Sequence, residues 1–229
     1  MYSDLFAEEG FVEGRRYDKP AVVANRQLQQ THYRGAVTAM DAAIGSVLDR
    51  LDEYGLTENT IVVFFSDNGG SGDADNTPLR GRKSTNFEGG VRVCSLIRFP
   101  GRIPAGTVNH QFLTSLEIVP TLLKLVGLDP PEDVILDGFD MMPMLTSSSA
   151  SPRTEMYWKR QAREAARVGN WKWIREKGMT FLFDLSKDVS EQNNLADQMP
   201  EKTAEMQKHF EAWLKRMDEA EPRGPFRDF

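Results

Sequence analysis

Two apolar runs that flank a glycine-rich, charged loop constrain this chain more than any other feature. The first run, Ile61–Phe65, is unbroken and rich in β-branched and aromatic residues. The second run, Val91–Phe99, follows a loop that holds Asp67, Asn68 and Lys83. A short apolar run of this composition is typical of a strand buried on both faces, as in a parallel sheet flanked by helices. We therefore expect an α/β fold in which both runs are strands.

The loop between the two runs concentrates the unusual chemistry of the sequence. Asp67 and Asn68 directly follow the first predicted strand, and open α/β sheets bind ligands at the carboxyl ends of their strands. Their side-chain oxygens are hard donors of the kind that Ca²⁺ or Mg²⁺ takes. Lys83, close to Arg80 and Arg82, offers a compact cation for an anionic ester oxygen. An Asp-Asn-Gly-Gly tetrapeptide also suits an ordinary turn, so these residues alone leave both interpretations open.

Composition excludes several classes of function. The chain has 229 residues and a formal net charge of −6, so it lacks the basic footprint of a nucleic-acid-binding protein. It has no apolar run long enough for a membrane span. A single cysteine excludes an internal disulfide framework. The N-terminus lacks a signal-peptide core, and the compartment stays open.

Periodicity and turn signals divide the rest of the chain. Apolar residues at spacings of three and four predict a helix over 27–54. A capping box at Thr114–Glu117 opens a second helix that ends at Gly127. The expected organisation is a C-terminal part of an α/β domain over 1–145, a Ser-rich linker over 146–153, and a small α+β subdomain over 154–229.

The last part of the chain changes character. Short segments with glycine-containing turns predict a small antiparallel meander over 154–184, and an apolar stripe predicts a covering helix over 200–218. The tryptophans at 158, 171 and 173 suit either packing against that helix or a carbohydrate-binding platform. We favour packing.

Several stretches, taken together and in order, resemble the type I sulfatases. These are calcium-dependent sulfuric ester hydrolases of the alkaline phosphatase superfamily. The stretches with this resemblance are Ser66–Gly69, Pro78–Lys83, Glu88–Arg92, Tyr33–Asp41, Pro120–Leu123, Val168–Lys172, Phe183–Leu185 and Asn193–Ala196.

The resemblance implies roles for three residues. Asp67 and Asn68 match two ligands of the calcium ion, and Lys83 matches the catalytic lysine that also binds the sulfate group. Sulfatases use a formylglycine nucleophile made from Cys or Ser in a Cys/Ser-x-Pro/Ala-x-Arg motif. The only cysteine, Cys94, is followed by Ser-Leu-Ile-Arg and does not match. The chain therefore resembles roughly the C-terminal half of a sulfatase, with an alkaline-phosphatase-like, mostly parallel sheet, and we expect it to be inactive alone.

The resemblance also leaves alternatives and partners open. Expected substrates are small-molecule or carbohydrate sulfate esters, and Ca²⁺ is expected to bind weakly or not at all to the chain alone, because two ligands are few for this ion. One alternative is a phosphodiester or phosphonate hydrolase of the same superfamily. Another is a non-catalytic protein that binds an anion or a partner. In that second case self-association would cover the edge of the sheet. A split enzyme, completed by a separate N-terminal half, is a third alternative. Many sulfatases are periplasmic or secreted.

Overall fold

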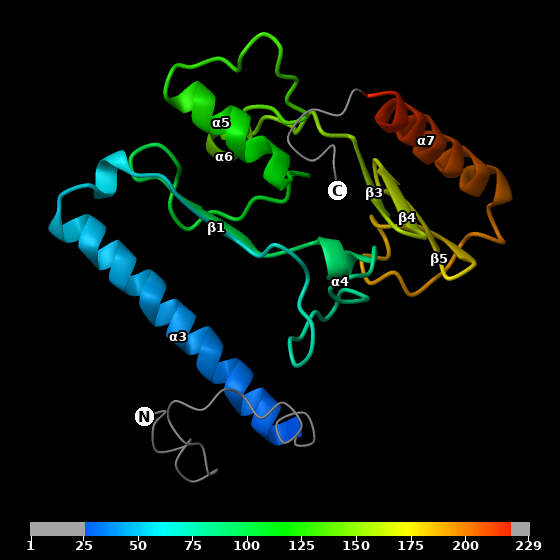
Figure 1. Cartoon of the computed structure of the whole chain (residues 1–229), viewed down its shortest axis with the longest axis horizontal. Coiled ribbons are helices and arrows are strands. Elements are labelled where there is room, and N and C mark those ends of the chain that lie inside the picture. Colours follow the sequence, from blue (N-terminus) through cyan, green and yellow to red (C-terminus); the bar gives the residue numbers. More distant parts are fainter. Residues whose placement is uncertain (1–25, 221–229) are drawn as a thin grey trace, which may run out of the picture.

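The computed structural model describes residues 26–220, and the surface segment expected over 1–24 lies outside them. Figure 1 shows a long helix and a small two-stranded sheet on one side, and a four-stranded sheet with its own helix on the other. The elements are α3 (Arg26–Glu53), η1 (Thr57–Asn59), β1 (Val62–Phe65), α4 (Glu88–Val91), β2 (Ser95–Arg98), η2 (Ser115–Glu117), α5 (Ile118–Leu125), α6 (Met142–Thr146), β3 (Glu155–Arg160), β4 (Arg163–Val168), β5 (Trp171–Glu176), β6 (Met179–Asp184) and α7 (Pro200–Glu219).

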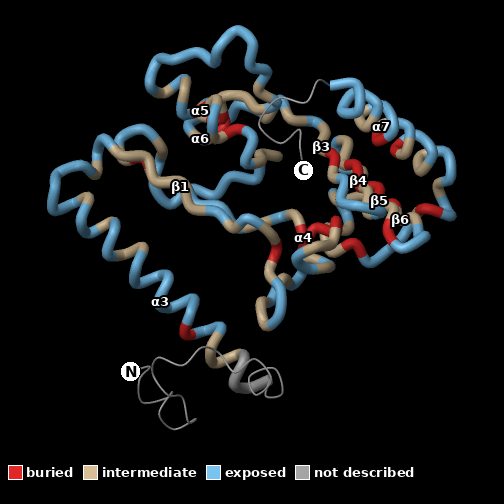
Figure 2. Tube along the Cα trace, viewed as in Figure 1, coloured by how far each residue is buried: buried red, intermediate tan, exposed pale blue. Residues whose placement is uncertain are grey.

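Helix α3 confirms the helix predicted from periodicity. Gly55 ends it with a φ of +65°, a conformation that glycine adopts without a Cβ penalty. The N–H of Leu56 then donates to the carbonyl of Leu51 at 2.8 Å. The apolar stripe of α3 is largely uncovered (Figure 2), and Val47 is 59% exposed. No helix among the described residues is both long enough and apolar enough to span a membrane.

The prediction of a mostly parallel sheet is wrong for the part of the chain that the structure describes. Strands β1 and β2 pair antiparallel, with Val62 opposite Arg98 and Phe65 opposite Ser95. A parallel pair needs a crossover of a dozen or more residues, usually a helix, that returns the chain to the same edge. Here the only helix between the strands is the four-residue α4, and the loop brings the chain back alongside itself.

The prediction that the first strand is buried on both faces is wrong as well. Residues of β1 are half-buried or exposed, and Leu96 on β2 is 65% exposed. The second strand is also shorter than predicted, because residues 88–91 form the turn of α4. Gly89 and Gly90 lie at the centre of α4 and allow the backbone to turn there. Val91, which is β-branched and was predicted to begin the strand, ends this helical turn instead.

The predicted capping box at Thr114 caps the 3-10 turn η2, and α5 follows directly from this turn at Ile118. The side chain of Thr114 accepts from the N–H of Leu116, and the carboxylate of Glu117 reaches back to Thr114. Glu117 also binds Arg153, whose Nε donates to Oε1 at 3.0 Å. This ion pair is nearly buried and joins α5 to the start of the four-stranded sheet. The predicted linker is therefore bonded to the segment before it, with Ser151 Oγ donating to the carbonyl of Phe112.

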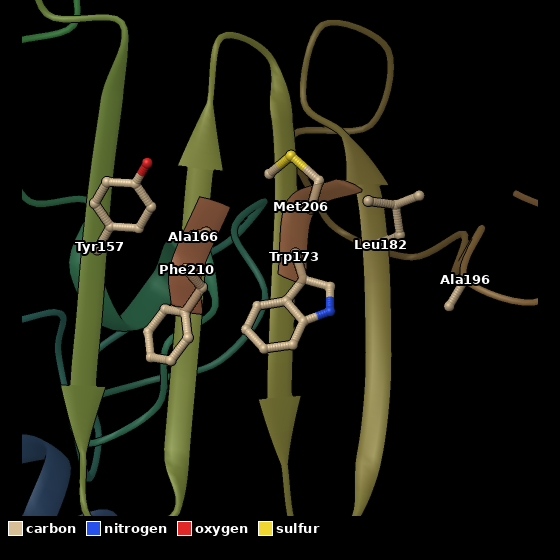
Figure 3. Close-up of a cluster of buried hydrophobic side chains, with 7 residues drawn as sticks. All are labelled: Tyr157, Ala166, Trp173, Leu182, Ala196, Met206 and Phe210. Carbon is tan, nitrogen blue, oxygen red and sulfur yellow. The ribbon is translucent and has the colours of Figure 1, made fainter. Parts of the chain in front are cut away.

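The four-stranded sheet confirms the predicted antiparallel meander, with strand order β3-β4-β5-β6. One face packs against α7 (Figure 1). Figure 3 shows Trp173 of β5 and Phe210 of α7 in this core, where both side chains are fully buried and their ring centroids lie 5.5 Å apart. Tyr157 stacks on Trp213 at 5.2 Å. The packing of Trp173 against the helix follows the interpretation favoured from the sequence.

The other face of the sheet covers the loop that carries the candidate site. Side chains alternate along β5, so Lys172 and Ile174 point away from Trp173 and α7. Ile174 packs with Phe183 and with Phe87 of the loop. The sheet is thus buried on both faces, and its second face holds residues 80–92 in place.

Candidate functional site

Backbone hydrogen bonds tie the segment after β1 to both later parts of the loop. The N–H of Gly69 donates to the carbonyl of Gly90 at 3.0 Å, and the N–H of Lys83 donates to the carbonyl of Gly70 at 3.0 Å. Asn76 closes the loop with a side chain that both accepts from and donates to Gly70. Asn68 and Lys83 therefore lie on neighbouring segments of backbone, although they are fifteen positions apart in the chain.

The glycines allow this close approach. A Cβ added to Gly69 would lie 1.8 Å from the carbonyl oxygen of Gly89, and one added to Gly90 would lie 2.2 Å from that of Thr85. Such contacts cannot form without moving the backbone. The sequence therefore uses glycine here because two stretches of backbone touch.

Gly69→Ala is expected to destabilise the chain by about 1–3 kcal/mol, as overpacking does elsewhere. Gly45→Ala is the matched control: a Cβ there meets nothing within 4 Å, and alanine in a helix interior is favoured over glycine by about 0.5–1 kcal/mol. Thermal unfolding followed by circular dichroism should lower the midpoint for the first variant and keep or raise it for the second. Equal midpoints for both variants would contradict the packing described here.

Asn68 and Lys83 line one hollow of about 490 Å³ between the loop and strand β3. The other lining residues are Ser84, Thr85, Asn86, Gly90, Val91, Tyr157, Trp158, Lys159, Arg160 and Trp213. The side chain of Lys83 makes no hydrogen bond or ion pair with another residue in the part of the chain that the structure describes. The hollow thus combines an amide with an unpaired ammonium group, a combination suited to an anion.

The other residues singled out from the sequence lie elsewhere. Asp67 is exposed and is not among the residues that line the hollow. Arg80 stacks over the ring of Phe87 at 4.3 Å and donates to the carbonyl of Glu191 at 2.8 Å. Arg82 lies with Arg80 beside a second hollow. The three basic residues Arg80, Arg82 and Lys83 are therefore divided between two hollows. Among them only Lys83 lines the same hollow as Asn68.

A buried ionic network joins the end of the loop, at Glu88, to strand β5 and to Glu191. Lys172 is fully buried, and its Nζ lies 2.6 Å from Oε1 of Glu88 and 3.4 Å from Oε1 of Glu191. The other oxygen of Glu191 accepts from the backbone N–H of Glu88 at 2.6 Å. Buried charges are stable only when they are paired and hydrogen-bonded, so these residues fix α4, which lies five residues after Lys83 in the chain.

This network contains two carboxylates for one fully buried ammonium. Burial raises the pKa of Glu191 to about 7, and the Lys172 ammonium opposes that rise. A protonated Glu191 leaves Glu88 and Lys172 as a neutral pair, with Arg92 3.7 Å from the second oxygen of Glu88. Sequence reasoning missed Lys172 and Glu191, because the only available signal was a lysine between two tryptophans on a strand.

The raised pKa of Glu191 predicts a pH dependence of stability. Between the ordinary value of 4.5 and about 7, the folded chain keeps a proton that the unfolded chain releases. The free energy of unfolding, relative to that of Glu191→Gln, is therefore expected to fall by about 3 kcal/mol as the pH rises through this range. Urea unfolding of both proteins at several pH values measures the difference. A difference that stays flat would contradict this prediction.

The residues after β1 fit a hard cation in chemistry but not in number. Asp67 and Asn68 supply oxygen donors, as Ca²⁺ requires. Among residues 26–220, however, no cluster of three or more His, Cys, Asp or Glu side chains is placed to hold a metal ion. Calcium takes six to eight oxygens, so most of its ligands would come from outside this group of residues.

Comparisons with protein families match the chain twice. The family described as "Sulfatase" matches residues 5–128, and "N-sulphoglucosamine sulphohydrolase, C-terminal" matches residues 82–220. N-acetylgalactosamine-6-sulfatase of Canis lupus familiaris is 35% identical over 150 residues, which are 63% of this chain and 29% of that protein. Arylsulfatase A of Homo sapiens is 34% identical over 175 residues, which are 67% and 34% of the two chains. The chain thus spans about a third of these relatives.

Solved structures show the same fold. "Ps i-CgsB in complex with k-i-k-neocarrahexaose" aligns with a TM-score of 0.74 and 29% identity, over 80% of this chain and 43% of the other. A protein solved with "its substrate D-Glucosamine-2-N, 6-O-disulfate" aligns with a TM-score of 0.67 and 23% identity, over 96% and 47%. The first family match alone covers more than half of the chain. The chain belongs to the sulfatase family.

Proposed function

We propose that this chain supplies part of the active site of a sulfuric ester hydrolase that cleaves a sulfate monoester. Asp67 and Asn68 would hold Ca²⁺, and Lys83 would bind an anionic oxygen of the ester and assist the leaving oxygen. The observation that carries the proposal is the shared hollow of Asn68 and Lys83, in which the ammonium has no partner of its own among the described residues.

Charge explains why such a site suits a sulfate ester. The anionic oxygens of the ester repel a nucleophile, so a site must place positive charge against them before the reaction begins. A bound Ca²⁺ would supply part of that charge. Lys83 supplies another part from a loop that the Gly69–Gly90 hydrogen bond and the buried Lys172 network hold rigid. The nucleophile, a formylglycine, is not among the residues of this chain.

A second polypeptide segment is part of the proposal. Exposed apolar side chains on α3, β2 and α5, among them Val47, Leu96 and Val119, give the chain an uncovered apolar surface. The relatives are about three times as long as the matched region. We propose that a segment with the Cys/Ser-x-Pro/Ala-x-Arg motif packs on this surface and completes the site.

Hydrolysis of 4-nitrophenyl sulfate tests the proposal. The isolated chain is expected to release no 4-nitrophenol above background, because it lacks the nucleophile. The chain fused behind a sulfatase segment that carries the motif is expected to release it in the presence of Ca²⁺. Faster cleavage of bis(4-nitrophenyl) phosphate by the fusion would favour the phosphodiesterase alternative, and turnover by the isolated chain would overturn the assignment of a missing nucleophile.

A further inference from the structure

We propose that the second hollow, between the loop and the turn that joins β5 to β6, binds a small aromatic ligand with an anionic group and a neutral hydrogen-bond donor. A hydroxylated aryl carboxylate has this chemistry. Glu176 would accept from the donor, and Lys177 would hold the anionic group. The inference uses neither Lys83 nor the hollow that Lys83 lines, so it goes beyond the proposed function and does not depend on it.

The walls of the second hollow come from two distant parts of the chain. One wall belongs to the loop, from Arg80 to Phe87, and the other to the hairpin of β5 and β6, from Glu176 to Phe181. The volume is about 420 Å³, which lies within the range of small-molecule sites. The hollow is therefore large enough for a ligand with one aromatic ring and polar substituents.

Glu176 gives the first sign of a ligand. Its side chain is 7% exposed, and Oε1 lies 3.0 Å from Nε of Arg163. Arg163 also donates to the carbonyl of Ser84, so the carboxylate is held against the loop. Its Oε2 is buried and has no hydrogen-bond partner among the described residues. Buried polar atoms in native proteins nearly always have a partner, and we assign this one to a donor of the ligand.

The charges around Glu176 favour a neutral donor. Arg163 already pairs with the carboxylate, and Arg80 and Arg82 line the same hollow. These guanidinium groups would repel the ammonium group of a ligand, whereas they would not repel a hydroxyl. The same excess of positive charge attracts an anionic group on another part of the ligand.

The turn between β5 and β6 places Lys177 for that anionic group. Lys177 and Gly178 have φ values of +54° and +76°, as a two-residue type I′ turn requires. Asn and Asp are preferred at the first of these positions, and a positive φ is uncommon for lysine. Lys177 lines the hollow and makes no ion pair within residues 26–220. The turn itself therefore does not favour lysine here, whereas an anionic ligand would.

An apolar surface between these polar groups suits the ring of the ligand. Phe87 and Phe181 pack edge to face, with their centroids 5.4 Å apart and their planes at 72°. Both line the hollow together with Met179, which is 54% exposed. Aromatic and thioether side chains pack well against an aromatic ring. A ring bound here would cover Met179 while its substituents reach Glu176 and Lys177.

Isothermal titration of the full 229-residue chain tests the inference with three probes. These are 4-hydroxybenzoate, 4-methoxybenzoate, which cannot donate, and 4-hydroxybenzamide, which has no charge. We expect 4-hydroxybenzoate to bind about tenfold more tightly than the methoxy compound, the value of one hydrogen bond to a charged group. We expect it to bind about three- to fivefold more tightly than the amide, the value of an exposed ion pair.

Three variants locate the two contacts. Glu176→Gln should abolish the first ratio, because its amide can donate to either oxygen substituent. Lys177→Asn should abolish the second ratio alone and keep or raise the thermal midpoint, since Asn suits the turn. Lys159→Gln/Arg160→Gln removes two cations beside the other hollow and should keep both ratios. Because each ratio compares two probes on one protein, a partly unfolded fraction cancels.

Four outcomes would overturn the inference. One is the absence of 4-hydroxybenzoate binding by the wild-type chain. A first ratio that persists in Glu176→Gln would mean that the methoxy group is excluded by its size, and a second ratio that persists in Lys177→Asn would remove the anion contact. Lys83→Gln should change neither ratio. Loss of binding in that variant would place the probe in the first hollow, and would leave the proposed function untouched.

Discussion

Lys172→Met is expected to lower the free energy of unfolding by about 3–5 kcal/mol, the usual effect of removing one partner from a buried ion pair. The variant keeps most of the side-chain volume but leaves Glu88 and Glu191 without the ammonium that lies 2.6 and 3.4 Å from them. Since a small domain is stable by about 5–15 kcal/mol, the loss is a large fraction of the total. Urea unfolding followed by tryptophan fluorescence at pH 7 measures it.

Two comparisons identify the cause of that loss. Lys208→Met removes an exposed lysine on α7 and is expected to match the wild type. Adding Glu88→Gln to Lys172→Met is expected to recover part of the stability, because one of the two unpaired carboxylates is removed. The loss should also shrink at pH 5, where Glu191, with its pKa raised to about 7, carries a proton and needs no ammonium partner. A loss below about 1 kcal/mol at pH 7 would contradict a structural role for the network.

The second large effect concerns catalysis. In the fused, complete enzyme, Lys83→Met is expected to lower kcat/KM for 4-nitrophenyl sulfate by about 10²–10³, as the loss of one charge-stabilising donor does in other hydrolases. Lys83→Arg is expected to recover little, since a planar guanidinium does not replace a compact ammonium at a fixed position. Initial rates at several substrate concentrations separate an effect on kcat from one on KM.

Arg82→Met is the matched control for this effect. Arg82 is adjacent in sequence and is also exposed, but it lines the second hollow and not the one that Lys83 lines. We expect its kcat/KM to stay within about threefold of the wild type, as for surface changes away from a site. If both variants lose activity equally, the loop as a whole matters and Lys83 has no special role.

The pairing of β1 shows where sequence reasoning reached its limit for the fold. An apolar block such as 61–65 indicates a strand, but its partner depends on how the following loop returns. The local signals for the helix over 27–54, the capping box at Thr114 and the meander were sufficient, because they depend on residues close together in the chain. Strand pairing across a loop of almost thirty residues depends on tertiary contacts.

The candidate site, like the fold, was predicted from the sequence only in part. The donor chemistry of Asp67, Asn68 and Lys83 suits an anion site with a metal, but it was the resemblance to the sulfatases that gave the three residues their roles, and these roles stay a prediction. Only the tertiary structure decided that Arg80 stacks on Phe87 and that Lys172 is buried with Glu88. It also decided that Asn86, Lys159 and Arg160 face the same hollow as Lys83. The physical reason is that the chemistry of a side chain is local, whereas its burial and its partners depend on segments distant in the sequence, which meet only in the folded chain.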